Sequence, residues 1–242
     1  MEKDELTRRD FVTTVAAGIV AAALSYVGHN NLLDCFTDDP TPSQCDRVGL
    51  GGNSHKTRLR RILDAHSAQL AQHPIWASWI SAHKSDPKSS FKQLPAKGIR
   101  RLAADRLTEW NRLRLVLATA SPDVCEQLWT GGVSENALFN ALAAIPESDA
   151  IGWFALSREA GALEIQQSRL PEIDDDAIAD GIKVIASELK NQHERERYST
   201  LIVRGENLRG PEACEALKGT LTGAITMPPP LRERFLRALS AI

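Results

Sequence analysis

Apolar residues recur at helical spacing along most of this chain, from about residue 55 to its end. One such stripe consists of Leu59, Ile62, Leu63 and Leu70, which fall on the same face of a helix over about residues 55–72. The same spacing predicts further helices at about residues 75–80, 99–117, 122–130, 134–145, 147–156, 174–189, 212–222 and 231–239, of which 99–117 is the longest. The pattern therefore predicts an all-α protein.

Several of the predicted helices have readable ends. Ser121 followed by Pro122 is typical of an N-cap with proline in the first turn, and Gly131-Gly132 is a stop signal. Ser134 and Pro146 are expected to begin the next two helices. The sequence from Ser81 to Gln93 is a polar break, and the β-prone fragment Leu201-Ile202-Val203 is too isolated to build a sheet.

Prolines stand near the starts of four predicted helices at intervals of 24 to 27 residues, at Pro95, Pro122, Pro146 and Pro171. Such spacing can mark stacked helical repeats, so the expected architecture is either an irregular multi-helix bundle or a short helical array. We expect about eight helices, preceded by an N-terminal signal or anchor helix. The domain organisation we expect is a signal or anchor over 1–28, a linker over 29–54 and a helical domain over 55–242.

The first 28 residues have a different pattern. Arg8 and Arg9 are followed by one variable residue, then by Phe11 and an apolar run from Val12 to Gly28. This arrangement resembles the twin-arginine (Tat) export signal of bacteria, although Thr13 and Thr14 depart from the family pattern. The resemblance implies that the protein folds in the cytoplasm and is carried across the inner membrane by the Tat translocase.

Two fates of the signal remain open from the sequence. Ala23-Leu24-Ser25 offers the small residues that a signal peptidase reads, so cleavage before Tyr26 would release a soluble periplasmic protein. Residues 11–28 also reach the lower length limit for a membrane-spanning helix, which would hold the protein at the inner membrane. In both cases the helical domain is expected in the periplasm.

Composition excludes some classes of function. The formal net charge is −2, with 43% hydrophobic and 25% charged residues, which is ordinary for a globular protein. Nucleic-acid binding usually depends on strongly basic faces, so we expect no nucleic-acid partner.

The chain has four cysteines, an even number that an oxidising compartment could pair. Cys35 and Cys45 flank a turn-rich segment, so we favour a disulfide between them. Cys125 and Cys214 lie in helical pattern, where they could join distant helices or remain thiols. No Cys-x-x-Cys spacing is present, which argues against zinc.

No motif in the chain carries chemistry by itself. There is no His-Glu-x-x-His, no Gly-x-Ser-x-Gly and no complete phosphate-binding loop, so we expect neither a metal nor a cofactor. Glu109, beside Trp110, is the nearest to a candidate general acid, and would suit a glycan-cleaving enzyme if it were buried. A surface Glu109 paired with Arg106 or Arg112 within one turn is the competing expectation.

Five tryptophans against two tyrosines is the remaining peculiarity of the composition. Most are expected in the core, but Trp76 and Trp79 lie close enough for one to be buried while the other lines a binding surface. We therefore expect a non-catalytic domain that binds another envelope protein. The alternative is an envelope hydrolase that acts on glycan with an acid in a tryptophan-lined cleft.

The export hypothesis makes a direct prediction. The double substitution Arg8→Lys, Arg9→Lys keeps the charge but removes the arginine pair, so we expect the protein to stay in the cytoplasm, as cell fractionation would show. Lys3→Arg serves as a control that leaves the pair intact. Undiminished export of the double variant would refute the assignment.

Overall fold

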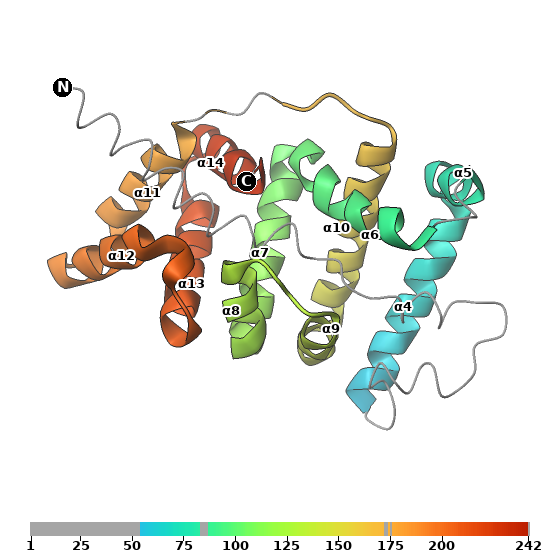
Figure 1. Cartoon of the computed structure of the whole chain (residues 1–242), viewed down its shortest axis with the longest axis horizontal. Coiled ribbons are helices and arrows are strands. Elements are labelled where there is room, and N and C mark those ends of the chain that lie inside the picture. Colours follow the sequence, from blue (N-terminus) through green and yellow to red (C-terminus); the bar gives the residue numbers. More distant parts are fainter. Residues whose placement is uncertain (1–53, 83–86, 172–173, 175, 242) are drawn as a thin grey trace. The chain divides into compact units, whose positions relative to one another are not determined.

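The computed structural model describes residues 54–82, 87–171, 174 and 176–241 (Figure 1). All secondary-structure elements in these ranges are helical, namely eleven α-helices and two short 3-10 helices. The prediction of an all-α fold is thus confirmed for this part of the chain. The expected signal over 1–28, with Arg8, Arg9 and Phe11, lies outside the described residues, as do Cys35 and Cys45.

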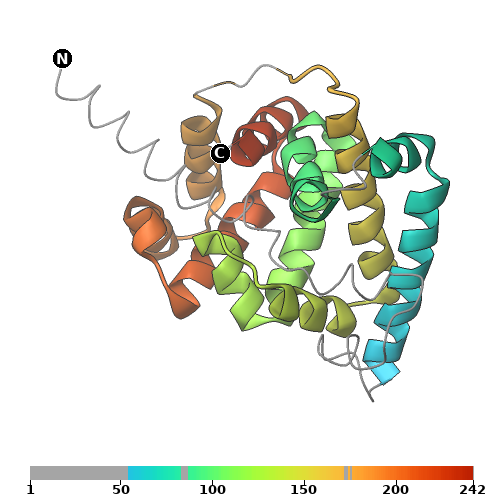
Figure 2. The same ribbon diagram turned by 45° about the vertical axis from the view of Figure 1, so that its right-hand side comes forward.

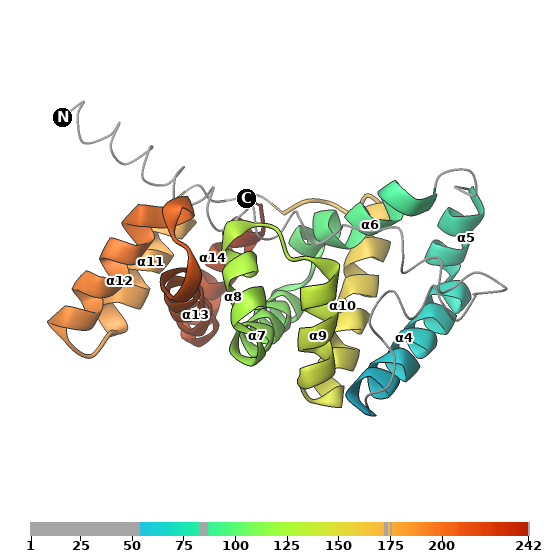
Figure 3. The same ribbon diagram turned by 60° about the horizontal axis from the view of Figure 1, so that its bottom comes forward.

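The helices of the predicted domain over 55–242 fall into two compact units. Unit 1 takes its described residues from Ala103–Val133 and from Pro171 onward. Its elements are α7 (Ala104–Ala120), α8 (Pro122–Thr130), α11 (Ala177–Glu188), α12 (Gln192–Arg204), the 3-10 helix η2 (Gly205–Asn207), α13 (Gly210–Thr226) and α14 (Pro229–Ala241). In this unit α13 packs against α7, α8, α11, α12 and α14, and Figure 3 shows α11 and α12 side by side.

Unit 2 takes its described residues from those before Ala103 and from Ser134–Leu170. Its elements are α4 (Ser54–Gln72), α5 (Pro74–Ala82), α6 (Pro87–Gly98), the 3-10 helix η1 (Ile99–Arg101), α9 (Glu135–Ala144) and α10 (Glu147–Ile165). Here α10 is the central helix, since it contacts α4, α5, α6 and η1. Figure 2 shows α4 in cyan and α10 in dark yellow.

The helix ends expected around α8 and α9 are present. The Ser121 hydroxyl accepts a hydrogen bond from the Val124 amide at 3.3 Å, and the Ser134 hydroxyl does the same for Ala137. Gly131 ends α8 with a φ of 88°, a left-handed conformation that glycine adopts without steric cost. These three local signals are confirmed.

Two expectations about the elements were wrong. The segment predicted as a polar break over 81–93 contains most of α6, which begins at Pro87. The β-prone Leu201-Ile202-Val203 forms no sheet, as expected, and lies inside α12, because Tyr198, Leu201 and Ile202 share a buried helical face while Val203 is 58% exposed. The helix over 99–117 was expected to be the longest, but it begins only at Ala104, after η1. It is therefore shorter than α4 and α10.

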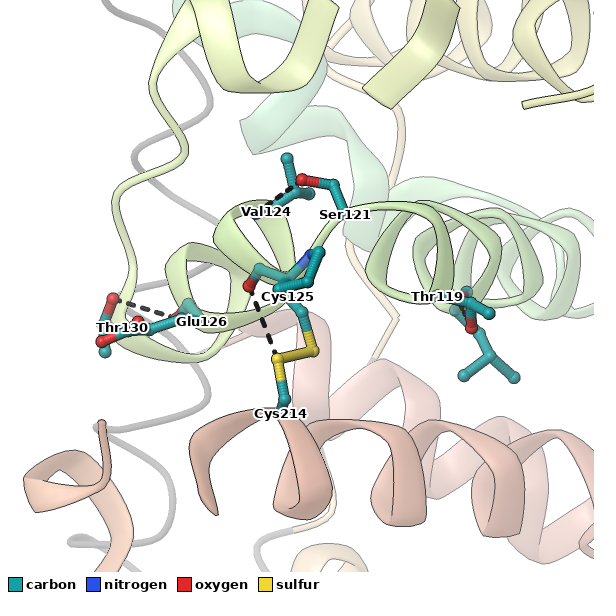
Figure 4. Close-up of a disulfide and its surroundings, with 9 residues drawn as sticks. Thr119, Ser121, Val124, Cys125, Glu126, Thr130 and Cys214 are labelled. Atoms are coloured by element: carbon teal, nitrogen blue, oxygen red, sulfur yellow. Dashed lines mark hydrogen bonds between the residues drawn. A yellow bond between two sulfur atoms is a disulfide. The ribbon is translucent and has the colours of Figure 1, made fainter. Parts of the chain in front are cut away.

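A disulfide joins Cys125 of α8 to Cys214 of α13, with 5.2 Å between the two Cα atoms (Figure 4). Cys125 is fully buried, and the Cys214 Sγ lies 3.6 Å from the carbonyl oxygen of Pro122. The nearby Trp129 indole donates a hydrogen bond to the carbonyl of Gly205 at 2.9 Å. The disulfide and this hydrogen bond together fix α8 against the C-terminal helices of unit 1.

Within the described ranges, none of the helices combines the length and apolar character needed to cross a membrane. The segment considered as an anchor, 11–28, is outside those ranges.

The disulfide spans 89 residues of sequence, so closing it should restrict the unfolded chain strongly. In a Cys35→Ala, Cys45→Ala background, we expect reduction to lower the free energy of unfolding by about 4 kcal/mol. Denaturant unfolding with and without reductant measures the difference. An unfolding midpoint that is the same with and without reductant would contradict this prediction.

Candidate functional site

A shallow, open groove of about 510 Å³ runs along α5 in unit 2. Five of its six lining residues come from α5 and one from the end of α10: Pro74, Ile75, Ser78, Trp79, Ala82 and Ile165. None of these side chains is charged, and the Ser78 hydroxyl and the Trp79 indole N–H are the only side-chain polar groups among them. The groove is thus a mostly apolar surface open to solvent.

The local sequence explains why α5 presents this surface. The chain leaves α4 at Gln72 and restarts at Pro74, a residue suited to the first turn of a helix because it has no amide hydrogen to satisfy. The nine residues of α5 are nearly all apolar or small, yet Trp76 is the only one that is buried. Ile80 is 37% exposed, and Trp79 is partly exposed. The helix therefore keeps apolar side chains at the surface.

Trp76 anchors α5 to the rest of unit 2. Its ring is 1% exposed and packs with Leu70 and Ala162, and its indole N–H donates to the carbonyl of Arg158 at 3.0 Å. The ring lies so close to Gly161 that a Cβ atom there would overlap it. Glycine is therefore required at this point of α10, because any side chain would displace the tryptophan.

Trp79 meets Trp76 edge to face, with 6.3 Å between ring centroids and 75° between ring planes. Such an arrangement is favourable for aromatic pairs. The buried ring therefore holds the outer ring in place at the groove. A rigid aromatic side chain at a surface is a common anchor in protein interfaces.

A polar cluster ties α4 to α10 near the Trp76 anchor. Arg158 contacts the His66 Nδ1 at 3.2 Å and donates to the Gln69 side-chain oxygen at 2.6 Å. Burial, with a smaller contribution from the charge of Arg158, lowers the pKa of His66 to about 4. Arginine only donates, so His66 is neutral and accepts through Nδ1, and Phe154 lies against its ring at 5.0 Å.

The structure places Glu109 at the surface of unit 1. Its carboxylate accepts two hydrogen bonds from Arg112, at 2.7 and 2.8 Å, and its side chain is 38% exposed. Trp110 beside it is buried. The residue singled out as a possible glycan-cleaving acid is therefore held in a surface ion pair within one turn of α7.

The other tryptophans lie in the cores. Trp110, Trp129 and Trp153 are at most 4% exposed. Trp79 is the exception, and it lines the groove. Sequence reasoning missed the contribution of Ile165, because nothing local to that residue indicates that the end of α10 lies beside α5.

No cluster of three or more histidine, cysteine or acidic side chains suited to a metal ion occurs in the part of the chain that the structure describes. His66 lies in α4, whereas His73 follows Gln72, the last residue of that helix.

The pKa of His66 gives unit 2 a pH dependence with a defined sign. Because the folded pKa of about 4 is below the ordinary 6.5, acid favours the unfolded chain, and stability falls as pH drops from about 6.5 to 4. Relative to a His66→Gln variant, which still accepts from Arg158, we expect a loss of up to about 3 kcal/mol. Parallel pH profiles of unfolding for the two proteins would contradict this.

Comparison with known proteins gives no family to which the chain belongs. No protein-family model matches it, and neither a curated protein nor a solved structure shows significant similarity. The groove and the residues around it are therefore the features of the chain that bear on its function.

Proposed function

We propose that this chain is an exported helical protein of the bacterial cell envelope that acts without catalysis, by binding another envelope protein through the groove along α5. The observation that carries the proposal is the groove itself, an apolar, open surface held in place by the buried Trp76. Exposed apolar patches on globular proteins commonly mark interaction sites.

The chemistry of the groove indicates what the partner presents. Ile75, Trp79 and Ile165 supply large apolar side chains, and the lining contains no charge to pair with an acidic or basic ligand. An apolar stripe of a helix would fit such a surface, since helix-in-groove binding depends on a few large apolar anchors. We therefore assign the partner as a protein with an exposed amphipathic helix.

The same lining favours binding over hydrolysis. Catalysis of glycan cleavage needs two carboxyl groups that flank the bond, and the groove contains none. Glu109, the acid considered for that reaction, is paired with Arg112 and lies in unit 1, whereas the groove belongs to unit 2. The hydrolase alternative therefore draws no support from the groove.

The proposed location rests on the N-terminal pattern of Arg8, Arg9 and Phe11, through which the Tat translocase would export the protein. The disulfide between Cys125 and Cys214 agrees with this proposal, because such bonds persist in the periplasm and are rare in the cytosol. Attachment to the inner membrane through residues 11–28 remains part of the proposal as an alternative to cleavage.

The proposal predicts that Trp79→Ala abolishes capture of a specific protein while the fold survives. We would immobilise the full-length chain, incubate it with detergent-solubilised bacterial envelope proteins and identify the retained proteins by mass spectrometry. The matched control is Ile151→Ala, which removes a 50% exposed apolar side chain of unit 2 that does not line the groove.

We expect one protein to be retained by the wild type and by Ile151→Ala and lost with Trp79→Ala. Removing the partly exposed Trp79 ring should cost about 1 kcal/mol of stability, whereas Trp76→Ala should cost about 3–5 kcal/mol because it opens a cavity. Equal retention by the two surface variants would refute the groove as the binding surface.

A further inference from the structure

Arg114 is a buried arginine of unit 1 that forms no ion pair with any residue the structure describes. It lies on α7 in the middle of a buried stripe, and only 4% of its surface is exposed. The other buried residues of this helix are Leu107, Trp110, Asn111, Leu113, Leu117 and Ala118. An arginine at such a position usually reaches the surface with its charged end, but this side chain does not.

The guanidinium of Arg114 is only partly satisfied by hydrogen bonds. Its Nη1 donates to the side-chain oxygen of Asn111 at 3.2 Å, and the Asn111 amide nitrogen in turn donates to the carbonyl of Leu107 at 2.8 Å. The Nη2 of Arg114 is buried and has no hydrogen-bond partner among the described residues. Asn111, itself fully buried, therefore holds one side of the guanidinium and leaves the other unpaired.

The acids on the helices packed against α7 are engaged elsewhere or lie toward solvent. Those of α13 and α14 pair with other arginines: Glu212 with Arg204, Glu215 with Arg197 and Glu233 with Arg237. On α8, Asp123 is exposed and Glu126 is partly exposed. Burial alone lowers the pKa of Arg114 to about 10, with no nearby charge contributing.

The other buried arginine described in this unit has an acidic partner, as buried arginines usually do. Arg237, 7% exposed, pairs with Glu233 at 2.8 Å. A buried guanidinium without an acid is strongly unfavourable, because the charge loses its hydration and gains nothing in return. A buried positive charge with no acidic partner among the described residues points to an anion supplied as a ligand.

We propose that Arg114 and Asn111 form the polar end of a buried site in unit 1 that takes a small carboxylate ligand. A monocarboxylate neutralises the single charge of the guanidinium, whereas a phosphate dianion would leave a buried negative charge. A carboxylate oxygen also accepts directly from the unpaired Nη2.

The test is thermal unfolding of the full chain with sodium butyrate or sodium benzoate as probes, each compared with its neutral amide. At about ten times the dissociation constant, a bound carboxylate should raise the melting temperature by about 3 °C. Arg114→Met keeps an unbranched, flexible side chain and removes the charged guanidinium, so the rise should disappear. Arg112→Met, a surface change on the same helix, should retain it.

Organic acids extracted from the denatured wild-type protein provide a second readout, which does not depend on whether Arg114→Met folds. A carboxylic acid recovered in stoichiometric amount would support the site. Three results would overturn it: equal shifts with acid and amide, a shift with phosphate instead of carboxylates, or no shift with any probe together with no acid recovered.

Discussion

The packing of Trp76 is the interaction on which the surface of unit 2 depends. A single buried indole joins three segments, because its ring packs with Leu70 of α4, its N–H is bound by the Arg158 carbonyl of α10, and its own helix is α5. The ring occupies the space that a side chain at Gly161 would need. The outer face of α5 is consequently a fixed feature of the fold.

This constraint explains how a short apolar helix can remain at a surface. Isolated helices of nine residues are unstable in water, so α5 owes its structure to the tertiary contact rather than to its own propensity. Trp76 is the one buried residue of α5, and Ile75 packs against its cluster. Trp79 and Ile80 keep part of their surface exposed. Their apolar character is then available for a partner.

Much of the fold could be predicted from the sequence, because the signals that begin and end helices are local. The helix caps and the stop signal involve residues within one turn, so they can be recognised from the order of residues alone, as at Ser121, Ser134 and Gly131. The failure at α6 has a related origin, since this helix packs against the distant α10 and such contacts override local propensity.

The site was less accessible to prediction than the fold. Trp76 and Trp79 were singled out from the sequence, and the structure puts the first inside and the second at the groove. Ile165 and the Arg158 carbonyl lie more than 80 residues further along the chain than Trp79 and Trp76, and no local pattern indicates that pairing. The disulfide between Cys125 and Cys214 was only one of the open connectivities, because separation in sequence does not show which helices meet.

Site-specific photocrosslinking in living bacteria is the most direct test of whether a partner protein binds in the groove along α5. A photoreactive residue would replace Ser78 in the groove or, as a control, Asn140 on the exposed face of α9 in the same unit. If a partner binds in the groove, position 78 gives a discrete protein adduct in the periplasmic or inner-membrane fraction and position 140 gives none. Absence of an adduct from position 78, or identical adducts from both positions, would contradict it.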